Sequence, residues 1–174
     1  PYRVLMRARV GGEGGTDYIH ANALDGRLYI TRNAVRVPAT DSTPARETVP
    51  GRVTVFDLQT LTPLGEIPNG GGNGAVVDAK TGHGFASSHP NLSMFDTKSM
   101  QMIKSINPNE GNPASNTQFS ADGIYFDPSD DRVYIGSHPT KELIVLAARD
   151  GAVLGKIDLG GIPEQTISDG NGTL

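Results

Sequence analysis

A three-part phrase occurs three times along this chain of 174 residues. It consists of a short segment centred on an aromatic residue, an apolar segment that closes on Asp in the first two copies, and a segment that ends on Ile. The copies occupy residues 26–30, 55–57 and 65–67, then 82–86, 94–96 and 104–106, then 131–135, 145–147 and 155–157. Self-similarity at a period of roughly 40–50 residues, built only from strands and turns, is typical of β-propeller blades. The repeat therefore predicts an all-β propeller made of four-stranded antiparallel blades.

Composition agrees with an all-β fold and narrows the possible functions. Gly (22) and Pro (12) fall between short alternating segments, which is the distribution of a protein with many turns. Cysteine is absent, which excludes disulfide frameworks, thiolate zinc sites and cysteine nucleophiles. The net charge is −4 and no run of basic residues occurs, so we expect no nucleic-acid partner. No stretch approaches the roughly 20 apolar residues that span a bilayer, so we expect no membrane span.

The copies predict a single, partial propeller over residues 1–174. Whole blades are predicted over residues 17–67, 74–106 and 123–157, with residues 1–10 as the outer strand of a preceding blade and residues 161–174 as the start of the next. Gly172-Thr173-Leu174 matches Gly26-Arg27-Leu28, so the sequence stops inside a fourth copy. Because an open ring exposes two apolar blade faces, we expect the remaining blades to come from the rest of a longer chain. A complete four-bladed ring, closed by the N-terminal strand, is the alternative.

Two connections are much longer than their counterparts in the other copies. Residues 33–51 are rich in Thr, Pro and Arg and have no hydrophobic period, so we interpret them as an excursion of the loop between the second and third strands of a blade. Residues 107–122 lengthen the connection between consecutive blades. Loops of this length either contact partners or are tolerated surface insertions, and the sequence leaves both interpretations open.

Two sets of repeated residues are predicted to be structural. Tyr29, Phe85 and Tyr134 occupy equivalent positions and are expected to pack between blades. Asp57 and Asp96 are each followed three residues later by a hydroxyl residue, which predicts turns capped by the Asp side chain between the two outer strands.

Residues 12–18, 26–31, 53–60, 127–135 and 161–164 resemble the YncE-like proteins of the YVTN β-propeller repeat family. The resemblance covers nearly the whole chain apart from residues 33–51 and part of residues 107–122. It implies a seven-bladed ring, export to the periplasm or the cell surface, and a binding or scaffold role. The family pattern contains no universal catalytic signature, and this sequence contains no signal peptide.

A first candidate site follows the second strand of each blade. Aligning the three aromatic residues places Asn33, His89 and His138 at one position, in a loop on the face of a propeller where ligands commonly bind. Two histidines on neighbouring blades can coordinate a transition metal or act as acid and base. Alternatively, each Asn or His caps the strand end through a local hydrogen bond.

A second candidate site lies on the same face, where each innermost strand begins. Its residues are polar and mostly acidic, and they are Glu13, Asp17, His20, Asn73, Asp122 and Glu164. Such an oxygen-rich channel mouth suits Ca²⁺, Mg²⁺ or a cationic or polyhydroxylated ligand. The spacing is not a metal motif, and solvated polar residues at a wet channel mouth are the alternative. We predict no cofactor, with Ca²⁺ or Mg²⁺ as the ions that this mouth would take.

We therefore expect a non-enzymatic binding or scaffold propeller, because the sequence contains no complete catalytic constellation. Its partners are a protein or the other parts of a larger assembly, and its inserted loops are the expected contact regions. The alternative function is a lactonase-like, metal-dependent hydrolase. Its site would use Glu13, Asp17, Asn73, Asp122 and Glu164.

Overall fold

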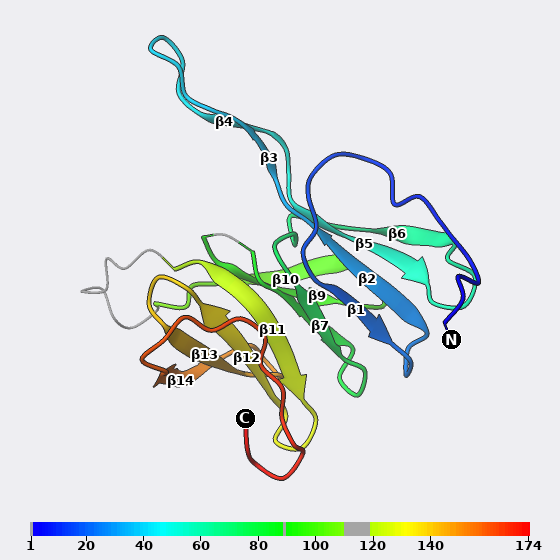
Figure 1. Cartoon of the computed structure of the whole chain (residues 1–174), viewed down its shortest axis with the longest axis vertical. Helices are drawn as coiled ribbons and strands as arrows, with labels where there is room; N and C mark the ends of the chain where they lie inside the picture. The colour runs from blue at the N-terminus through cyan, green and yellow to red at the C-terminus, as the bar shows by residue number, and fades with distance from the viewer. Residues whose placement is uncertain (1, 89, 110–118) are drawn as a thin grey trace.

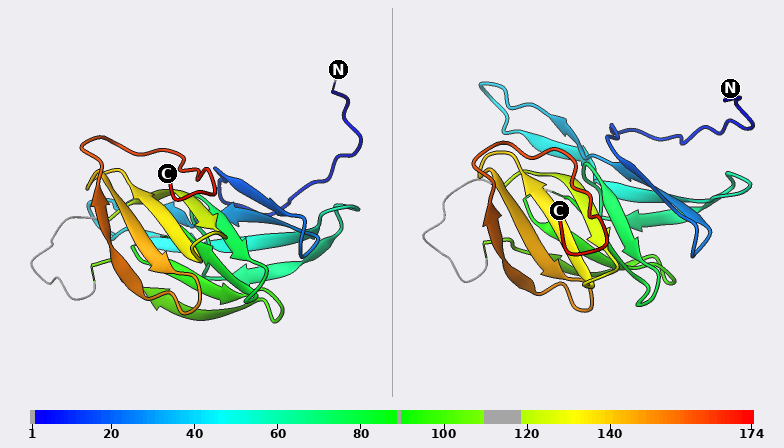
Figure 2. Two further views of the ribbon diagram at one scale, coloured as in Figure 1. Left: turned by 90° about the horizontal axis from the view of Figure 1, so that it is seen from below. Right: turned by 60° about the horizontal axis from the view of Figure 1, so that its bottom comes forward.

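The repeated phrase folds into three four-stranded antiparallel sheets that lie side by side (Figures 1 and 2). The computed structural model describes residues 2–88, 90–109 and 119–174. The first blade contains β1 (Ile19–Asn22), β2 (Arg27–Arg32), β5 (Arg52–Asp57) and β6 (Pro63–Pro68). The second contains β7 (Ala75–Asp78), β8 (His83–Ala86), β9 (Leu92–Asp96) and β10 (Gln101–Ile106). The third contains β11 (Ala121–Asp127), β12 (Arg132–Ser137), β13 (Glu142–Ala147) and β14 (Val153–Asp158). The predicted all-β architecture of four-stranded antiparallel blades is confirmed.

The strands pair in the same register in all three blades. The aromatic residue of the second strand faces the same position of the third strand each time: Tyr29 faces Val55, Phe85 faces Met94, and Tyr134 faces Val145. Each outer pair of strands also carries a register shift. Because a one-residue slip would turn every side chain to the other face of the sheet, this common register brings equivalent residues to equivalent places.

The predicted Asp-capped turns are confirmed. The Oδ1 atom of Asp57 accepts hydrogen bonds from the backbone N–H and the hydroxyl of Thr60, at 2.7 and 2.8 Å. Asp96 accepts the same pair of bonds from Ser99, at 2.6 and 2.7 Å. These bonds, the backbone one foremost, lower the pKa of both carboxyl groups, since they stabilise the charged form.

The core consists of two apolar layers, each between neighbouring blades. The layer between the first and second blades contains Tyr29, Val53, Val55, Ile67, Ala75, Val77, Ala86 and Phe95. The layer between the second and third contains Phe85 of the second blade packed with apolar residues of the third. Tyr29 and Phe85 therefore pack between blades as predicted, and Tyr134 is buried as well.

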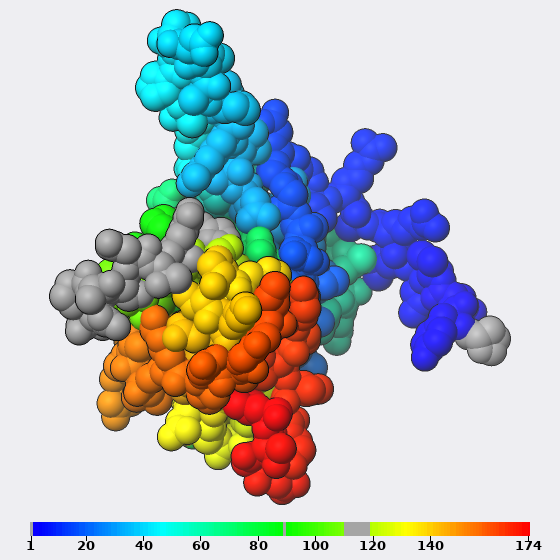
Figure 3. All heavy atoms as spheres, turned by 60° about the vertical axis from the view of Figure 1, so that its left-hand side comes forward, coloured from blue at the N-terminus to red at the C-terminus, as the bar shows by residue number. Residues whose placement is uncertain are grey.

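The insertion over residues 33–51 is more regular than the predicted loop excursion. β3 (Val35–Val37) and β4 (Arg46–Val49) form an antiparallel hairpin that projects from the first blade (Figures 1 and 3). Val35 pairs with Val49, and the Arg36 guanidinium lies 3.6 Å from the Glu47 carboxylate. Val35, Val37 and Val49 are β-branched, which favours strands, so this segment forms a small sheet although the sequence shows no hydrophobic period over its whole length.

The two segments predicted to belong to partial blades contain no strand among their described residues. Residues 2–10 contain no strand and lead away from the blades (Figure 2), and residues 159–174 contain no strand either. A strand needs a neighbour for its backbone N–H and C=O groups, and no described residue pairs with these segments as a strand. Within the described ranges, no helix is long and apolar enough to cross a membrane.

Candidate functional site

One end of the blades, which we call the rim, carries a hydrogen-bonded network that joins all three blades. Its centre is Asn73, just before β7. The backbone oxygen of Asn73 accepts bonds from Tyr18 N and Thr31 Oγ1 of the first blade, at 2.9 and 2.8 Å. Its side-chain Nδ2 donates to Asp122 Oδ1 of the third blade at 3.0 Å, and its Oδ1 accepts from Asn33 Nδ2 at 3.4 Å. The network fixes the position of the Asp122 carboxylate.

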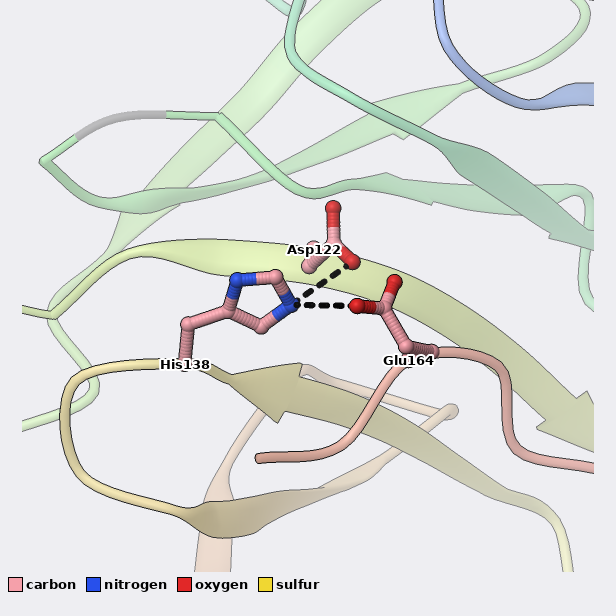
Figure 4. A group of neighbouring side chains, drawn as sticks. All are labelled: Asp122, His138 and Glu164. Carbon is pink, nitrogen blue, oxygen red and sulfur yellow. Dashed lines mark ion pairs between the residues drawn. The ribbon is translucent and has the colours of Figure 1, made fainter. Parts of the chain in front are cut away.

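Three side chains with metal-ligating atoms converge beside this network, and we call them the rim triad: Asp122, His138 and Glu164. Asp122 lies in β11, His138 follows β12, and Glu164 belongs to the segment after β14 (Figure 4). His138 Nε2 lies 3.0 Å from Asp122 Oδ2 and 3.7 Å from Glu164 Oε1. One ligating atom from each residue lies within 4.8 Å of the other two.

Two glycines let the C-terminal segment approach the third blade closely enough to deliver Glu164. A Cβ atom at Gly123 would lie 2.1 Å from the backbone oxygen of Glu164. A Cβ atom at Gly136 would lie 3.2 Å from Pro163 Cγ. The position of Glu164 therefore depends on the absence of side chains at these two points.

The donors of the triad differ in burial. The Asp122 side chain is 8% exposed, whereas that of Glu164 is 70% exposed, so the triad is closed on one side and open to solvent on the other. His138 Nε2 itself is buried and makes no hydrogen bond with a described residue. Its 3.0 Å approach to Asp122 is an ion-pair contact without the direction of a hydrogen bond. A buried ring nitrogen in this state is costly unless something else pairs with it.

Negatively charged side chains surround Tyr18 at the rim. Tyr18, whose hydroxyl lies 3.4 Å from Asp122 Oδ2, has a raised pKa. Burial is the largest cause, and the negative charges of Asp122, Asp17 and Glu164 follow. Each carboxylate opposes formation of the tyrosinate because like charges repel, so these three negative charges add to the effect of burial on the pKa of Tyr18.

A pocket of about 830 Å³ opens next to the triad but is not lined by it. Asn33, Gly72 and Ser120, which adjoin the network in sequence or by contact, form part of its wall. The three side chains of the rim triad therefore lie beside the pocket, and the candidate site consists of the triad.

The structure brings together some of the predicted site residues and separates others. Asn33 and His138, predicted in the loop set, lie in one network with Asn73, Asp122 and Glu164, predicted in the acidic set. His89 lies outside the described residues. Glu13 and Asp17 are exposed and belong to no metal-capable group among the residues described, although the charge of Asp17 still acts on Tyr18 at the rim.

Glu13 lies in a loop that is held by Arg32, a contact that the sequence did not predict. The guanidinium of Arg32, which is buried, donates to the backbone oxygens of Gly11, Gly12 and Gly14 at 2.9, 3.1 and 2.8 Å. These bonds hold the glycine-rich loop as a structural unit with Glu13 at its exposed surface. Tyr18 was also missed, because a tyrosine at the start of a strand gives no signal of contact with a carboxylate 104 residues away.

His20 is not part of the rim triad, and its ring lies beside that of Tyr29 on one face of the first blade. Its ring lies 6.3 Å from the ring of Tyr29, centroid to centroid. Its Nε2 atom is buried and makes no hydrogen bond with a described residue. Burial lowers the pKa of His20 below 6.5, and the charge of Asp25 offsets only part of this effect. His20 is therefore a neutral packing residue.

Lowering the pH from about 7.5 to about 5 is expected to destabilise the fold through His20. In the unfolded chain His20 takes up a proton near pH 6.5, whereas in the folded chain it stays neutral until a lower pH. The free energy of unfolding therefore decreases as the pH is lowered through this window. His20→Leu, which cannot titrate, should show a shallower slope in denaturant unfolding measured across this range. Equal slopes for the two proteins would contradict the assignment.

Comparisons with solved structures show the β-propeller fold. The WD40 repeats of RRP9 match with a TM-score of 0.55 at 9% identity, over 80% of this chain and 37% of that one. The Cps50 (Swd1) β-propeller domain of Myceliophteria thermophila matches at 0.53 and 12%, over 89% of this chain and 59% of that one. The computationally designed Ika8 protein matches at 0.53 and 12%, over 83% and 38%. The chain thus spans about two fifths to three fifths of these structures. No protein-family model and no curated protein matches the sequence.

Proposed function

We propose that this chain belongs to a β-propeller that works by binding, and that it binds a cation at the rim triad. The observation that carries the proposal is the convergence of two carboxylates and one imidazole, from three separate places in the chain, within 4.8 Å of one another. Two carboxylates so close together repel each other, and a bound cation relieves that repulsion.

The surroundings of the triad also favour a cation. Among the described residues, His138 is the one ion-pair partner of Asp122 and Glu164. No Lys or Arg among the described residues pairs with either carboxylate, and Asp122 is largely removed from water. Burying an unpaired carboxylate is costly, so a positive ligand supported by the oxygens of both residues would be stabilised.

The setting we propose follows the resemblance to YncE-like proteins. That resemblance supports a binding or scaffold role, an exported protein, and further blades in the intact protein that complete the ring around the rim. The rim face then becomes one wall of a channel mouth, where ligands of propellers commonly bind.

Calorimetric titration of the intact protein tests the proposal. Ca²⁺, Mg²⁺, Zn²⁺ and spermidine are titrated separately, and at least one is expected to bind with one-to-one stoichiometry. Asp122→Asn and Glu164→Gln should each weaken that binding by about tenfold or more, because each removes one charge from the site. Asp131→Asn is the matched control, since Asp131 is an exposed carboxylate paired with Lys80 away from the triad. Binding of none of the four cations, or equal weakening by the control, would overturn the proposal.

A further inference from the structure

We infer that the cation at the rim triad is a divalent transition metal of the Zn²⁺ class, held by Asp122 Oδ2, His138 Nε2 and Glu164 Oε1. This inference rests on the proposed function and names the chemical class of its ligand. It differs from the sequence-based expectation of Ca²⁺ or Mg²⁺, which came from the oxygen-rich residues alone.

The donor set selects the class of metal. Ca²⁺ takes six to eight oxygen ligands, and Mg²⁺ keeps several waters around one or two carboxylates. Imidazole instead suits Zn²⁺, Cu²⁺, Fe²⁺ and Ni²⁺. His138 Nε2 faces both carboxylates (Figure 4), at 3.0 Å from Asp122 Oδ2 and 3.7 Å from Glu164 Oε1, so an ion that contacts both carboxylates lies next to the ring nitrogen.

The spacing of the donors fits the size of such an ion. Bonds of 2.0–2.1 Å to a tetrahedral Zn²⁺ place neighbouring donors about 3.3 Å apart. The two distances from His138 Nε2, 3.0 and 3.7 Å, lie on either side of this value. All three ligating atoms lie within 4.8 Å of one another, and the exposed Glu164 side chain can move to shorten the longer separations.

The ring nitrogen of His138 that faces the two carboxylates lacks a hydrogen-bond partner among the described residues. This nitrogen, Nε2, is buried, and two carboxylates lie beside it. Imidazole nitrogens are common ligands of transition metals, and this one faces both carboxylates (Figure 4) across a space of 3.0 and 3.7 Å. A metal ion in that space would supply the missing partner.

The residues around the triad act as a supporting shell. Asn73 Nδ2 donates to Asp122 Oδ1 and Tyr18 donates to Asp122 Oδ2, which together fix the carboxylate plane. Such partners orient a ligating group and raise metal affinity. Because three protein donors leave a fourth position on the solvent side of Glu164, the site is open and exchangeable.

Titration of the metal-free intact protein with Co²⁺, followed by visible absorption, tests the inference. The intense d–d bands of a tetrahedral or five-coordinate ion with one nitrogen donor are expected, and Zn²⁺ should displace Co²⁺ and remove them. By calorimetry, His138→Gln should weaken Zn²⁺ binding by about 100-fold, and Asn73→Ala, which changes only a supporting residue, by about tenfold. His83→Gln, a histidine of β8 outside the rim, is the control and should bind as the wild type does. Circular dichroism of each metal-free variant verifies its fold.

The outcomes separate this inference from the proposed function. Binding of Ca²⁺, Mg²⁺ or spermidine that needs Asp122 but not His138 would overturn the inference and leave the proposed function standing. Failure of every cation to bind would overturn both. Zn²⁺ binding that survives His138→Gln and Asp122→Asn unchanged would place the metal elsewhere and overturn the inference as well.

Discussion

Gly123→Ala is expected to weaken cation binding at the rim by about tenfold to 100-fold, although Gly123 ligates nothing. The new Cβ atom would lie 2.1 Å from the backbone oxygen of Glu164 and 3.2 Å from Gln165 Cα. Both are backbone atoms, so the segment itself must move. Bond lengths at metal sites stay within about 0.2 Å of their usual values, so the Glu164 side chain must leave its present conformation to keep its bond once the backbone has moved.

Gly155→Ala provides the matched control for Gly123→Ala. Gly155 lies in β14 of the same blade, and a Cβ atom there would meet nothing within 4 Å. Neither glycine has a φ in the left-handed region, so neither substitution strains its own residue. Titration of both variants with Zn²⁺ should separate them. If Gly123→Ala binds as tightly as Gly155→Ala, Glu164 is not held in place by the close approach that we describe.

The blades could be predicted from the sequence because each is determined by a short sequence pattern that is repeated along the chain. The phrase around Tyr29 sets the position of a turn, an aromatic residue and a paired strand, and the same phrase returns around Phe85 and Tyr134. Alternation of apolar residues fixes which faces are buried, and the common register follows from it.

The site was only partly predictable, because its geometry depends on contacts between blades. Repeat alignment placed His138 and Asp122 on the same face, because one strand begins and its antiparallel neighbour ends at the same end of the blade. It could not show that the segment after β14 folds back over Gly123 and places Glu164 beside them. That close approach depends on two glycines, Gly123 and Gly136, which are distant from Glu164 in the sequence. Residue type also misled for His20, whose ring turns inward toward Tyr29.

Phe95→Ala is expected to lower the free energy of unfolding by about 3–5 kcal/mol, the range for removal of a fully buried phenylalanine. That is a large part of the roughly 5–15 kcal/mol that stabilises a typical domain. Phe95 is 0% exposed, and its ring lies 6.2 Å from that of Tyr29 in the layer between the first and second blades. Its neighbour across the sheet is Gly84, which has no side chain to fill the cavity. Phe126→Ala, at a partly buried phenylalanine, should cost less in the same denaturant titration.

Gly84 and Phe95 together offer a stricter test. The effect of Gly84→Ala on the free energy of unfolding should be destabilising in the wild type and stabilising in the Phe95→Ala protein. In the wild type, a Cβ atom at Gly84 would lie 2.0 Å from Cε2 of the Phe95 ring, so the substitution overpacks the layer and costs about 1–3 kcal/mol. In the Phe95→Ala protein the ring is gone, and the added methyl enters the cavity and recovers about 1 kcal/mol. A double-mutant cycle in denaturant measures this coupling. If Gly84→Ala costs the same in both proteins, then Phe95 does not occupy the space above Gly84, and the packing between the first two blades rests on other contacts.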